Sequence, residues 1–464
     1  MQRRVLFVAA LGSFLSSLSS SIVGVVLPRI ADWAAVGVAD VAWVTLVPLL
    51  VIAAMLLPAG WVGDTYGHRE TYLAGSVFAV IGSLGCALAW DFQSLLLLRG
   101  VQGVGAALAM ASAPALVTLT APRERRGGSL GVTSTALYLG LTLGPPLGGW
   151  LESLAGFRAV FFAQVPLSLL LLGVCAVGLP RLGARREVAV RADWPGAVWM
   201  GVGVVALLLA LARGRDWPAP AMIAALGIGA AAVGGFVRRE RSVRDPILDL
   251  RLFADRTFLS AGIGAFLNYL ALFQASFLLP FYLVEARGMD TGHAGTLLML
   301  MPLVMSVVTG PSGALSDRVG SRSLSCAGMV ILGSGLATLT AAGLDTPLGW
   351  VVPALILLGL GSGLFVTPNT NTLLSAAPVH AQGGASAVMA LARILGMLAG
   401  TALAAVVSET ARSFASAAGS DPATAMISGF HTAWGVGVLV SIAGAGVVLI
   451  RAPRHGSRSL DPPL

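Results

Sequence analysis

Lysine is absent from this chain of 464 residues, so all 29 basic residues are arginine. Without lysine there can be no phosphate-binding GxxxxGK[ST] loop and no Schiff base to retinal or pyridoxal phosphate. Energy from ATP hydrolysis by the chain itself is therefore excluded, and we expect no bound nucleotide. Cysteine is scarce as well. Cys86, Cys175 and Cys326 lie in apolar stretches without paired spacing, and we interpret them as packing residues.

Charged residues are also few, at 11% of the chain, whereas hydrophobic residues reach 56% and the mean hydropathy is +0.86. No water-soluble core needs so much apolar sequence. Apolar stretches of about 20 residues, enough to cross about 30 Å of hydrocarbon as helices, follow one another with short polar joints. They are too long and too rich in glycine for barrel strands. We predict an all-α integral membrane protein with fourteen transmembrane helices, which start near positions 5, 41, 70, 93, 127, 158, 194, 220, 257, 291, 322, 348, 383 and 427.

The arginines are unevenly distributed between the two sides of these spans. With both termini on one side, that side holds 21 of the 29 arginines, the other side holds 6, and Arg99 and Arg393 fall within spans. Basic residues near helix ends resist crossing the bilayer, so the arginine-rich side is predicted to be cytoplasmic. The net charge of +8 then reflects topology, and we predict no nucleic-acid binding.

One ten-residue segment occurs twice. GWVGDTYGHR at 60–69 and GALSDRVGSR at 313–322 share glycine, aspartate, glycine and arginine at a constant spacing of 253 residues. APRERRGGSLGV at 121–132 and APVHAQGGASAV at 377–388 are related at a spacing of 256. The same spacing of 256 relates Gly140 and Gly144 to Gly396 and Gly400. A duplicated membrane unit is typical of transporters that work by alternating access.

The duplication predicts the domain organisation. Residues 1–180 are predicted to form an N-terminal six-helix bundle, and residues 257–464 a C-terminal six-helix bundle. Residues 181–256 are predicted to contain two linker transmembrane helices and a cytoplasmic loop. We find no cofactor motif, no cluster of histidines and carboxylates for a metal, and no pairing of nucleophile and base, so the sequence does not indicate an enzyme.

Several motifs together resemble one known family. LPAGWVGDTYGHR resembles its loop signature between helices 2 and 3, and LLLLRGVQGVGAA at 95–107 its helix 4 signature. GLTLGPPLGG at 140–149 resembles its helix 5 antiporter signature, and RDPILDLRLFADRTF at 244–258 the stretch that enters the second half. Over essentially its whole length the chain resembles the fourteen-helix drug:proton antiporters of the major facilitator superfamily. This implies the major facilitator fold, with two pseudo-symmetric six-helix bundles plus two additional helices.

The resemblance implies a secondary active transporter that exports small amphipathic molecules, such as drugs or antibiotics, driven by protons. Abundant alanine, glycine and arginine fit a GC-rich bacterial genome, so we expect the protein in the bacterial cytoplasmic membrane. We also expect a monomer, and the arginine distribution predicts that both termini are cytoplasmic. Two alternatives stay open. The protein could import an organic anion or metabolite, or it could be a receptor or scaffold that moves no substrate, although the sequence contains no soluble domain.

Two groups of residues are predicted to serve the conformational change. The repeated loops imply a latch at the cytoplasmic helix ends, formed by Asp64, Arg69, Asp317, Arg318 and Arg322. The first copy has Thr65 where the family usually has arginine. In the helix 5 signature, glycines allow close backbone approach and prolines allow a bend, which favours a seam between the halves. The seam residues are Gly140, Gly144, Pro145, Pro146, Gly148 and Gly149.

The first span departs from the family pattern LDxTIVNVALP, because this chain reads LSSSIVGVVLP at 18–28. Ser19 stands in place of the aspartate, and a serine neither attracts a cation nor titrates at neutral pH. The two arginines within spans, Arg99 and Arg393, have no obvious deep carboxylate partner. We therefore predict a neutral or anionic substrate that these arginines contact. The alternative is that both arginines bind backbone carbonyls and are structural.

Other polar residues complete the predicted cavity. They are Trp43, Gln102, Asn268, Gln274 and Asn369, although an amide in a membrane usually bonds a neighbouring helix. Asn268 and Gln274 share one span and are the preferred pair. Proton coupling must use a group nearer the membrane edge, and Glu152 or His431 is the predicted carrier, with a solvated helix-end role as the alternative.

Overall fold

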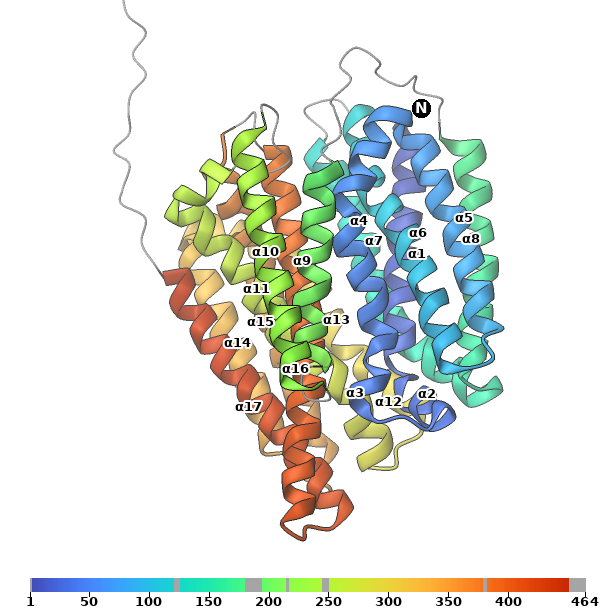
Figure 1. Cartoon of the computed structure of the whole chain (residues 1–464), viewed down its shortest axis with the longest axis vertical. Coiled ribbons are helices and arrows are strands. Elements are labelled where there is room, and N and C mark those ends of the chain that lie inside the picture. The colour runs from blue at the N-terminus through green and yellow to red at the C-terminus, as the bar shows by residue number, and fades with distance from the viewer. Residues whose placement is uncertain are drawn as a thin grey trace, which may run out of the picture.

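The computed structural model describes residues 2–120, 126–179, 194–213, 217–243, 250–378 and 382–449, which are almost entirely helical (Figure 1). Three features predicted from sequence lie outside these ranges. They are the boundary at 180/181, the charged residues 244–249 and the C-terminal residues 450–464.

The first half of the chain consists of helices joined by short turns. They are α1 (Gln2–Gly24), α2 (Leu27–Ala34), α3 (Val38–Val41), α4 (Trp43–Tyr66), α5 (His68–Ala87), α6 (Phe92–Thr120), α7 (Arg126–Ala155) and α8 (Phe157–Gly178). Two of the turns need glycine because their φ angles are positive, at 104° for Gly67 and 76° for Gly156.

Two further helices follow, α9 (Trp194–Arg213) and α10 (Ala219–Ser242), and then a short 3₁₀ turn, η2 (Leu250–Ala254). Helix α9 packs against α10, against α4 of the first half and against α16 of the second half. In Figure 1 the green helix α9 accordingly lies between the two halves, and α10 lies beside it.

The second half repeats the pattern. Its helices are α11 (Arg256–Phe281), η3 (Tyr282–Ala286), α12 (Thr291–Leu298), α13 (Leu300–Val319), α14 (Ser321–Thr340), α15 (Leu348–Ala376), α16 (Gln382–Ala417) and α17 (Pro422–Leu449). Gly320, between α13 and α14, has a φ of 93°, close to the value at the equivalent Gly67. The two copies of the repeated segment thus end in similar turns.

Twelve helical segments in the described ranges are long and apolar enough to cross a membrane. Their lipid-compatible surface carries many exposed apolar side chains, such as Val177, Ile81 and Leu97. The protein is therefore a multi-pass membrane protein. Helix α7 is not among the twelve, and the apolar stretch of α9, Val198–Leu211, is shorter. That α7 and α9 also cross the membrane, which would bring the total to fourteen spans, stays a prediction.

The repeat is visible in the way the helices cross. A Cβ added to Gly75 would lie 2.8 Å from the carbonyl oxygen of Gly105, so α5 and α6 touch through backbone. In the second half a Cβ on Gly328 would lie 2.6 Å from the carbonyl oxygen of Gly361, where α14 meets α15. Glycines 253 and 256 residues apart in sequence therefore make the same close helix crossing twice.

The two halves meet closely at the end of the molecule where α2, α3 and α12 lie, at the bottom of Figure 1 and away from the N-terminus. A Cβ on Gly149 of α7 would collide with the carbonyl oxygen of Thr291 and lie 2.9 Å from the Cα of Gly292. A Cβ on Gly295 of α12 would likewise collide with the carbonyl oxygen of Pro145. Only glycine fits at these positions, so this end is tightly closed.

Candidate functional site

Four polar side chains meet about halfway along the helices that line the junction of the halves. Tyr138 of α7 interacts with Thr309 of α13, and Arg393 of α16 interacts with Tyr269 of α11. Tyr138 also interacts electrostatically with Tyr269 and Arg393. We call these four residues the central cluster. Three of them come from the second half and Tyr138 comes from the first, so the cluster spans both.

Arg393 gives the central cluster a positive charge. Its side chain is half-buried, and none of the ion pairs formed among the described residues includes it. The hydrogen-bonding groups around it are hydroxyls, which do not neutralise a guanidinium. A charge held in this way favours a partner that is negative or accepts hydrogen bonds.

Arg99, the other arginine within a span, is 6% exposed and fully engaged inside the first half. It donates to the carbonyl oxygen of Val44 at 2.9 Å and to Oε1 of Gln102 at 2.6 Å. Gln102 in turn donates to Ser83 at 3.0 Å and to Gln164 at 3.2 Å. This network ties α6 to α4, α5 and α8. The geometry therefore fits the structural alternative for Arg99 and Gln102 better than contact with substrate.

Asn268 and Gln274, the preferred cavity pair, are both fully buried within the second half. Asn268 donates to the sulfur of Met329 at 3.4 Å and accepts from Ser362 at 3.1 Å. Within the described residues neither amide atom of Gln274 has a hydrogen-bond partner, and its Oε1 faces Gly437 of α17. The two amides are thus brought into one half but not to the junction with the other.

The remaining predicted cavity residues are Asn369, Trp43 and Ser19, and none of them belongs to the central cluster. Asn369 is 3% exposed and donates to the carbonyl oxygen of Ala261 at 2.9 Å. Trp43 is 7% exposed at the start of α4, and Ser19 is half-buried on α1. This hydrogen bond of Asn369 holds α15 to α11 within the second half.

The first copy of the predicted latch makes contacts within its own half. Asp64 lies 3.2 Å from Nε2 of His68 and is mostly exposed. Arg69 donates to the carbonyl oxygens of Leu179 at 2.9 Å and Ala176 at 3.1 Å, at the C-terminal end of α8. A cation at a helix C-terminus is stabilised by the helix dipole. In this structure Arg69 therefore holds the start of α5 to the end of α8.

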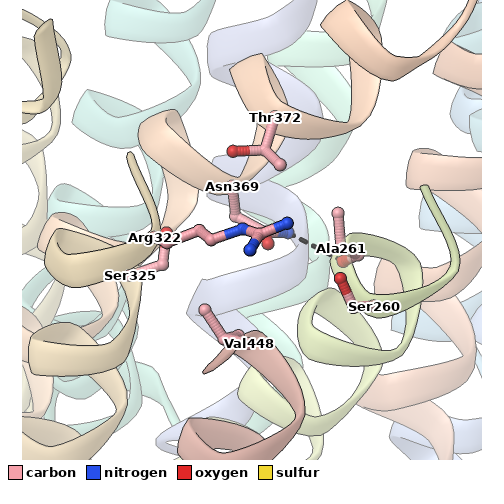
Figure 2. Close-up of a pocket in the computed structure, with 7 residues that line it drawn as sticks. All are labelled: Ser260, Ala261, Arg322, Ser325, Asn369, Thr372 and Val448. Carbon is pink, nitrogen blue, oxygen red and sulfur yellow. Dashed lines mark hydrogen bonds between the residues drawn. The ribbon is translucent and has the colours of Figure 1, made fainter. Parts of the chain in front are cut away.

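In the second copy Asp317 and Arg318 are exposed, while Arg322 turns into the bundle. Figure 2 shows its guanidinium beside Asn369, in a small pocket of about 10 Å³ between α11, α14, α15 and α17. Its Nη2 lies 3.5 Å from Oγ1 of Thr257. The pocket has room for about one water molecule and is too small for a substrate.

The seam differs in part from the expectation. Gly140, Gly144 and Gly148 face α1 of the same half, where Cβ atoms would meet residues between Phe14 and Val25. They therefore do not form the junction between the halves. Gly149 and the Pro145–Pro146 pair do approach α12 of the other half. The glycine stripe thus serves two neighbours, because it covers more than one face of α7.

The predicted proton carriers lie at the closed end of the molecule. Glu152 of α7 is 3.3 Å from Nε of Arg29, and its side chain is 13% exposed. His431 of α17 donates from Nε2 to the carbonyl oxygen of Ala342 at 2.9 Å. Each has a protein partner outside the central cluster.

Sequence reasoning missed Tyr138 and Thr309. One signal could have pointed to Tyr138, since the chain has only five tyrosines, and Tyr138 and Tyr269 lie near the middle of long helices of opposite halves. Thr309 gives no such signal, because threonine is common in membrane helices and usually bonds its own backbone. Thr309 does so here too, donating to the carbonyl oxygen of Met305.

Two helical halves with repeated crossings, a polar cluster between them and apolar flanks define a membrane transport protein. Comparison with known proteins agrees. Residues 9–401 match the Major Facilitator Superfamily, and the chain belongs to this family of transporters, which are not enzymes.

Individual relatives cover most of the chain. The riboflavin transporter RibZ of Clostridioides difficile (strain 630) is 28% identical over 86% of this chain and 86% of its own length. The multidrug resistance protein Stp of Mycobacterium tuberculosis (strain CDC 1551 / Oshkosh) is 30% identical over 87% of this chain and 75% of its own. A crystal structure of a POT family transporter in complex with 5-aminolevulinic acid has a TM-score of 0.72, 14% identity and 94% coverage of both chains, which shows a shared fold.

Proposed function

We propose that this transporter exports small amphipathic molecules by alternating access, in the manner of the fourteen-helix drug:proton antiporters. Residues 1–180 and 257–464 are the two moving bundles, and residues 181–256 hold the two additional helices. The termini are cytoplasmic, the membrane is a bacterial inner membrane, and the monomer is the working unit.

The central cluster carries this proposal. The interaction of Tyr138 with Thr309 joins side chains of the two halves, so it must change when the halves tilt against one another. The closed end at Gly149 and Gly295 lies beyond it, away from the N-terminus. A site between two rocking bundles, blocked at one end, is what alternating access requires. We assign this arrangement to the state that faces the cytoplasm.

The substrate is neutral or anionic. Arg393 offers a positive charge without a carboxylate beside it among the described residues, and Tyr138 and Tyr269 add phenol rings for stacking on an aromatic ring system. The names of two relatives, a riboflavin transporter and a multidrug resistance protein, support a substrate of the size of a flavin or a drug.

The driving force is the proton gradient, and Glu152 or His431 carries the proton. Both lie at the closed end, where a change of access would expose them to the other compartment. Ser19 in place of the usual aspartate means that the carrier is not on α1. Replacement of Glu152 by Gln, compared with His431→Asn, should identify the carrier as the variant that loses acceleration by an imposed pH gradient.

The decisive experiment measures flux in proteoliposomes under an imposed pH gradient. A carboxylated aromatic dye, riboflavin and a quaternary ammonium dye are compared for the wild type, Arg393→Gln and Arg393→Lys. We expect transport of the first two, a loss of about 10-fold or more for the anionic dye in Arg393→Gln, and partial activity in Arg393→Lys.

The control is Arg4→Gln, an exposed arginine at the start of α1 that should leave flux unchanged. Robust transport of the quaternary ammonium dye, insensitive to both Arg393 variants, would discard the anionic substrate. The alternative function, import of an organic anion, predicts uptake in right-side-out vesicles and none in everted vesicles.

A further inference from the structure

An apolar groove of about 760 Å³ lies on the membrane side of the molecule, apart from the central cluster. Its walls come from α4 of the first half and from the two additional helices α9 and α10. Ala54 and Pro58 lie on the α4 wall, Gly201 and Ala206 on the α9 wall.

Three pairs of helices surround the groove. Helix α9 is in close contact with α10 and with α4, whereas α4 and α10 are not in close contact with one another. Helices α9 and α10 touch where a Cβ on Gly229 would lie 2.7 Å from Leu207, and where Gly235 faces Trp199. Helix α9 also approaches α4, since a Cβ on Gly201 would lie 3.4 Å from the Cβ of Ala54. The space between α4 and α10 is left open.

The lining is hydrocarbon. It consists of alanine, valine, leucine, isoleucine, proline and glycine, with the indole of Trp217 as its single polar group among the described residues. Such a surface holds no ordered water and offers nothing to a charged or strongly polar ligand. The molecules proposed for the central cluster must present a polar group to Arg393, and the groove has no counterpart to it.

The length of the groove matches one lipid chain. Along α9 it extends from Val198 to Leu209, which is about 16 Å of helix. Half of a hydrocarbon core of about 30 Å is about 15 Å. Trp217 lines the groove near the start of α10, where indole rings prefer the membrane interface. An empty groove would forfeit the dispersion contacts of its walls.

We propose that this groove is a lipid site, occupied by one acyl chain of a membrane phospholipid that holds α9 and α10 to α4. The site depends only on the membrane embedding of the chain and not on the substrate or coupling ion of the proposed transport. In this proposal the two additional helices α9 and α10 supply a lipid site that the six-helix bundles do not form by themselves.

The test uses the full chain reconstituted with a phosphatidylethanolamine that carries a diazirine near the end of one acyl chain. After irradiation, labelled peptides are mapped by mass spectrometry. We expect labelling to concentrate on residues of α4, α9 and α10 that line the groove, and to fall about 5-fold or more in Gly201→Phe and in Ala224→Phe, which fill it from two walls.

Matched controls are Gly227→Phe and Ala231→Phe on α10, which lie outside the groove; no atom lies within 4 Å of a Cβ added to Gly227. Both should keep wild-type labelling. All variants must elute as one species and unfold at the wild-type temperature. Where a filling variant fails this, the other decides.

Two results would overturn the proposal. Labelling spread evenly over other lipid-facing helices such as α5 and α8, or undiminished in both filling variants, would mean that no chain is held. Loss of labelling when a transported dye is present during irradiation, at a concentration near its KM, would assign the groove to substrate instead of lipid.

Discussion

Tyr138 of α7 and Thr309 of α13 interact with one another across the junction between the two halves of the transporter. Thr309 already donates to the carbonyl oxygen of Met305 at 2.6 Å, so its oxygen is free to accept from the tyrosine hydroxyl. The carbonyl oxygen of Thr309 also accepts from Thr367 of α15 at 2.9 Å. Tyr138 is thereby aimed at a residue whose own position is fixed by two helices of the other half.

The first prediction concerns Tyr138→Phe, which removes the hydroxyl and keeps the ring. In the proposed site the hydroxyl of Tyr138 is a hydrogen-bonding group for the substrate, worth about 0.5–1.5 kcal/mol net, so we expect the KM for transport to rise by about 2- to 10-fold. The measurement is initial flux in proteoliposomes. Tyr66→Phe, at an exposed tyrosine at the end of α4, should leave KM unchanged. An unchanged KM in Tyr138→Phe would remove this residue from the site.

Arg99 should behave as a structural residue. In Arg99→Met the carbonyl oxygen of Val44 and Oε1 of Gln102 lose their donor inside the first half, and a buried unsatisfied group costs about 1–3 kcal/mol. We expect a lower unfolding temperature in detergent, with substrate preference unchanged in the protein that remains folded. Gln102→Leu should be non-additive with Arg99→Met, because both residues belong to one network.

The exposed Arg4 provides the comparison, since Arg4→Met should not alter the unfolding temperature. If Arg99→Met kept wild-type stability but changed which substrates are transported, the residue would belong to the cavity after all.

The helices could be predicted from the sequence because the length of an apolar stretch is a local property. Their duplication could be predicted because the repeated glycines can be read directly from the sequence. A helix begins within five residues of each of the fourteen expected starts. The equivalence of Gly75 with Gly328 follows from the 253-residue spacing alone. Backbone contact through these glycines then follows from chemistry, since few other residues permit so close a crossing.

The partners of the polar residues could not be predicted in the same way. Gln102 bonds Gln164, which is 62 residues away, and the rotation of α6 about its axis decides this choice. Arg393 and Arg99 therefore look alike in sequence, although one joins the central cluster and the other is enclosed by the first half.

Gly149→Val should shift the balance between access states. The added side chain would collide with the carbonyl oxygen of Thr291 on the other half, and overpacking costs about 1–3 kcal/mol. We expect the population in which this end is closed to fall by about 5- to 150-fold relative to the population in which it is open. Gly173→Val on α8 has open space around its Cβ and should leave the balance unchanged.

The readout is the distance between spin labels at Ala155 and Ala418, which are exposed positions at this end of opposite halves. Pulsed electron resonance should report longer distances in Gly149→Val than in the wild type and in Gly173→Val. Identical distance distributions in all three would mean that the contact at Gly149 does not hold the end closed.

Asp91 should make the stability of α6 depend on pH. Its Oδ1 accepts from the backbone nitrogen of Ser94 at 2.7 Å, and Ser94 Oγ donates back to the carbonyl oxygen of Asp91 at 2.8 Å. The backbone hydrogen bond from Ser94, followed by the side-chain one, lowers the pKa of Asp91 below its ordinary value of 3.8. A lowered pKa contributes stability above pH 3.8, and this is lost as pH falls through the folded-state value.

The unfolding temperature of the wild type should therefore exceed that of Asp91→Ala at about pH 7 and about pH 5, and the difference should shrink below pH 3.8. Asp91→Asn keeps an acceptor that does not titrate, so its difference from Asp91→Ala should stay constant over the same range. A wild-type difference that did not change in acid would mean that the carboxylate charge contributes nothing to this cap.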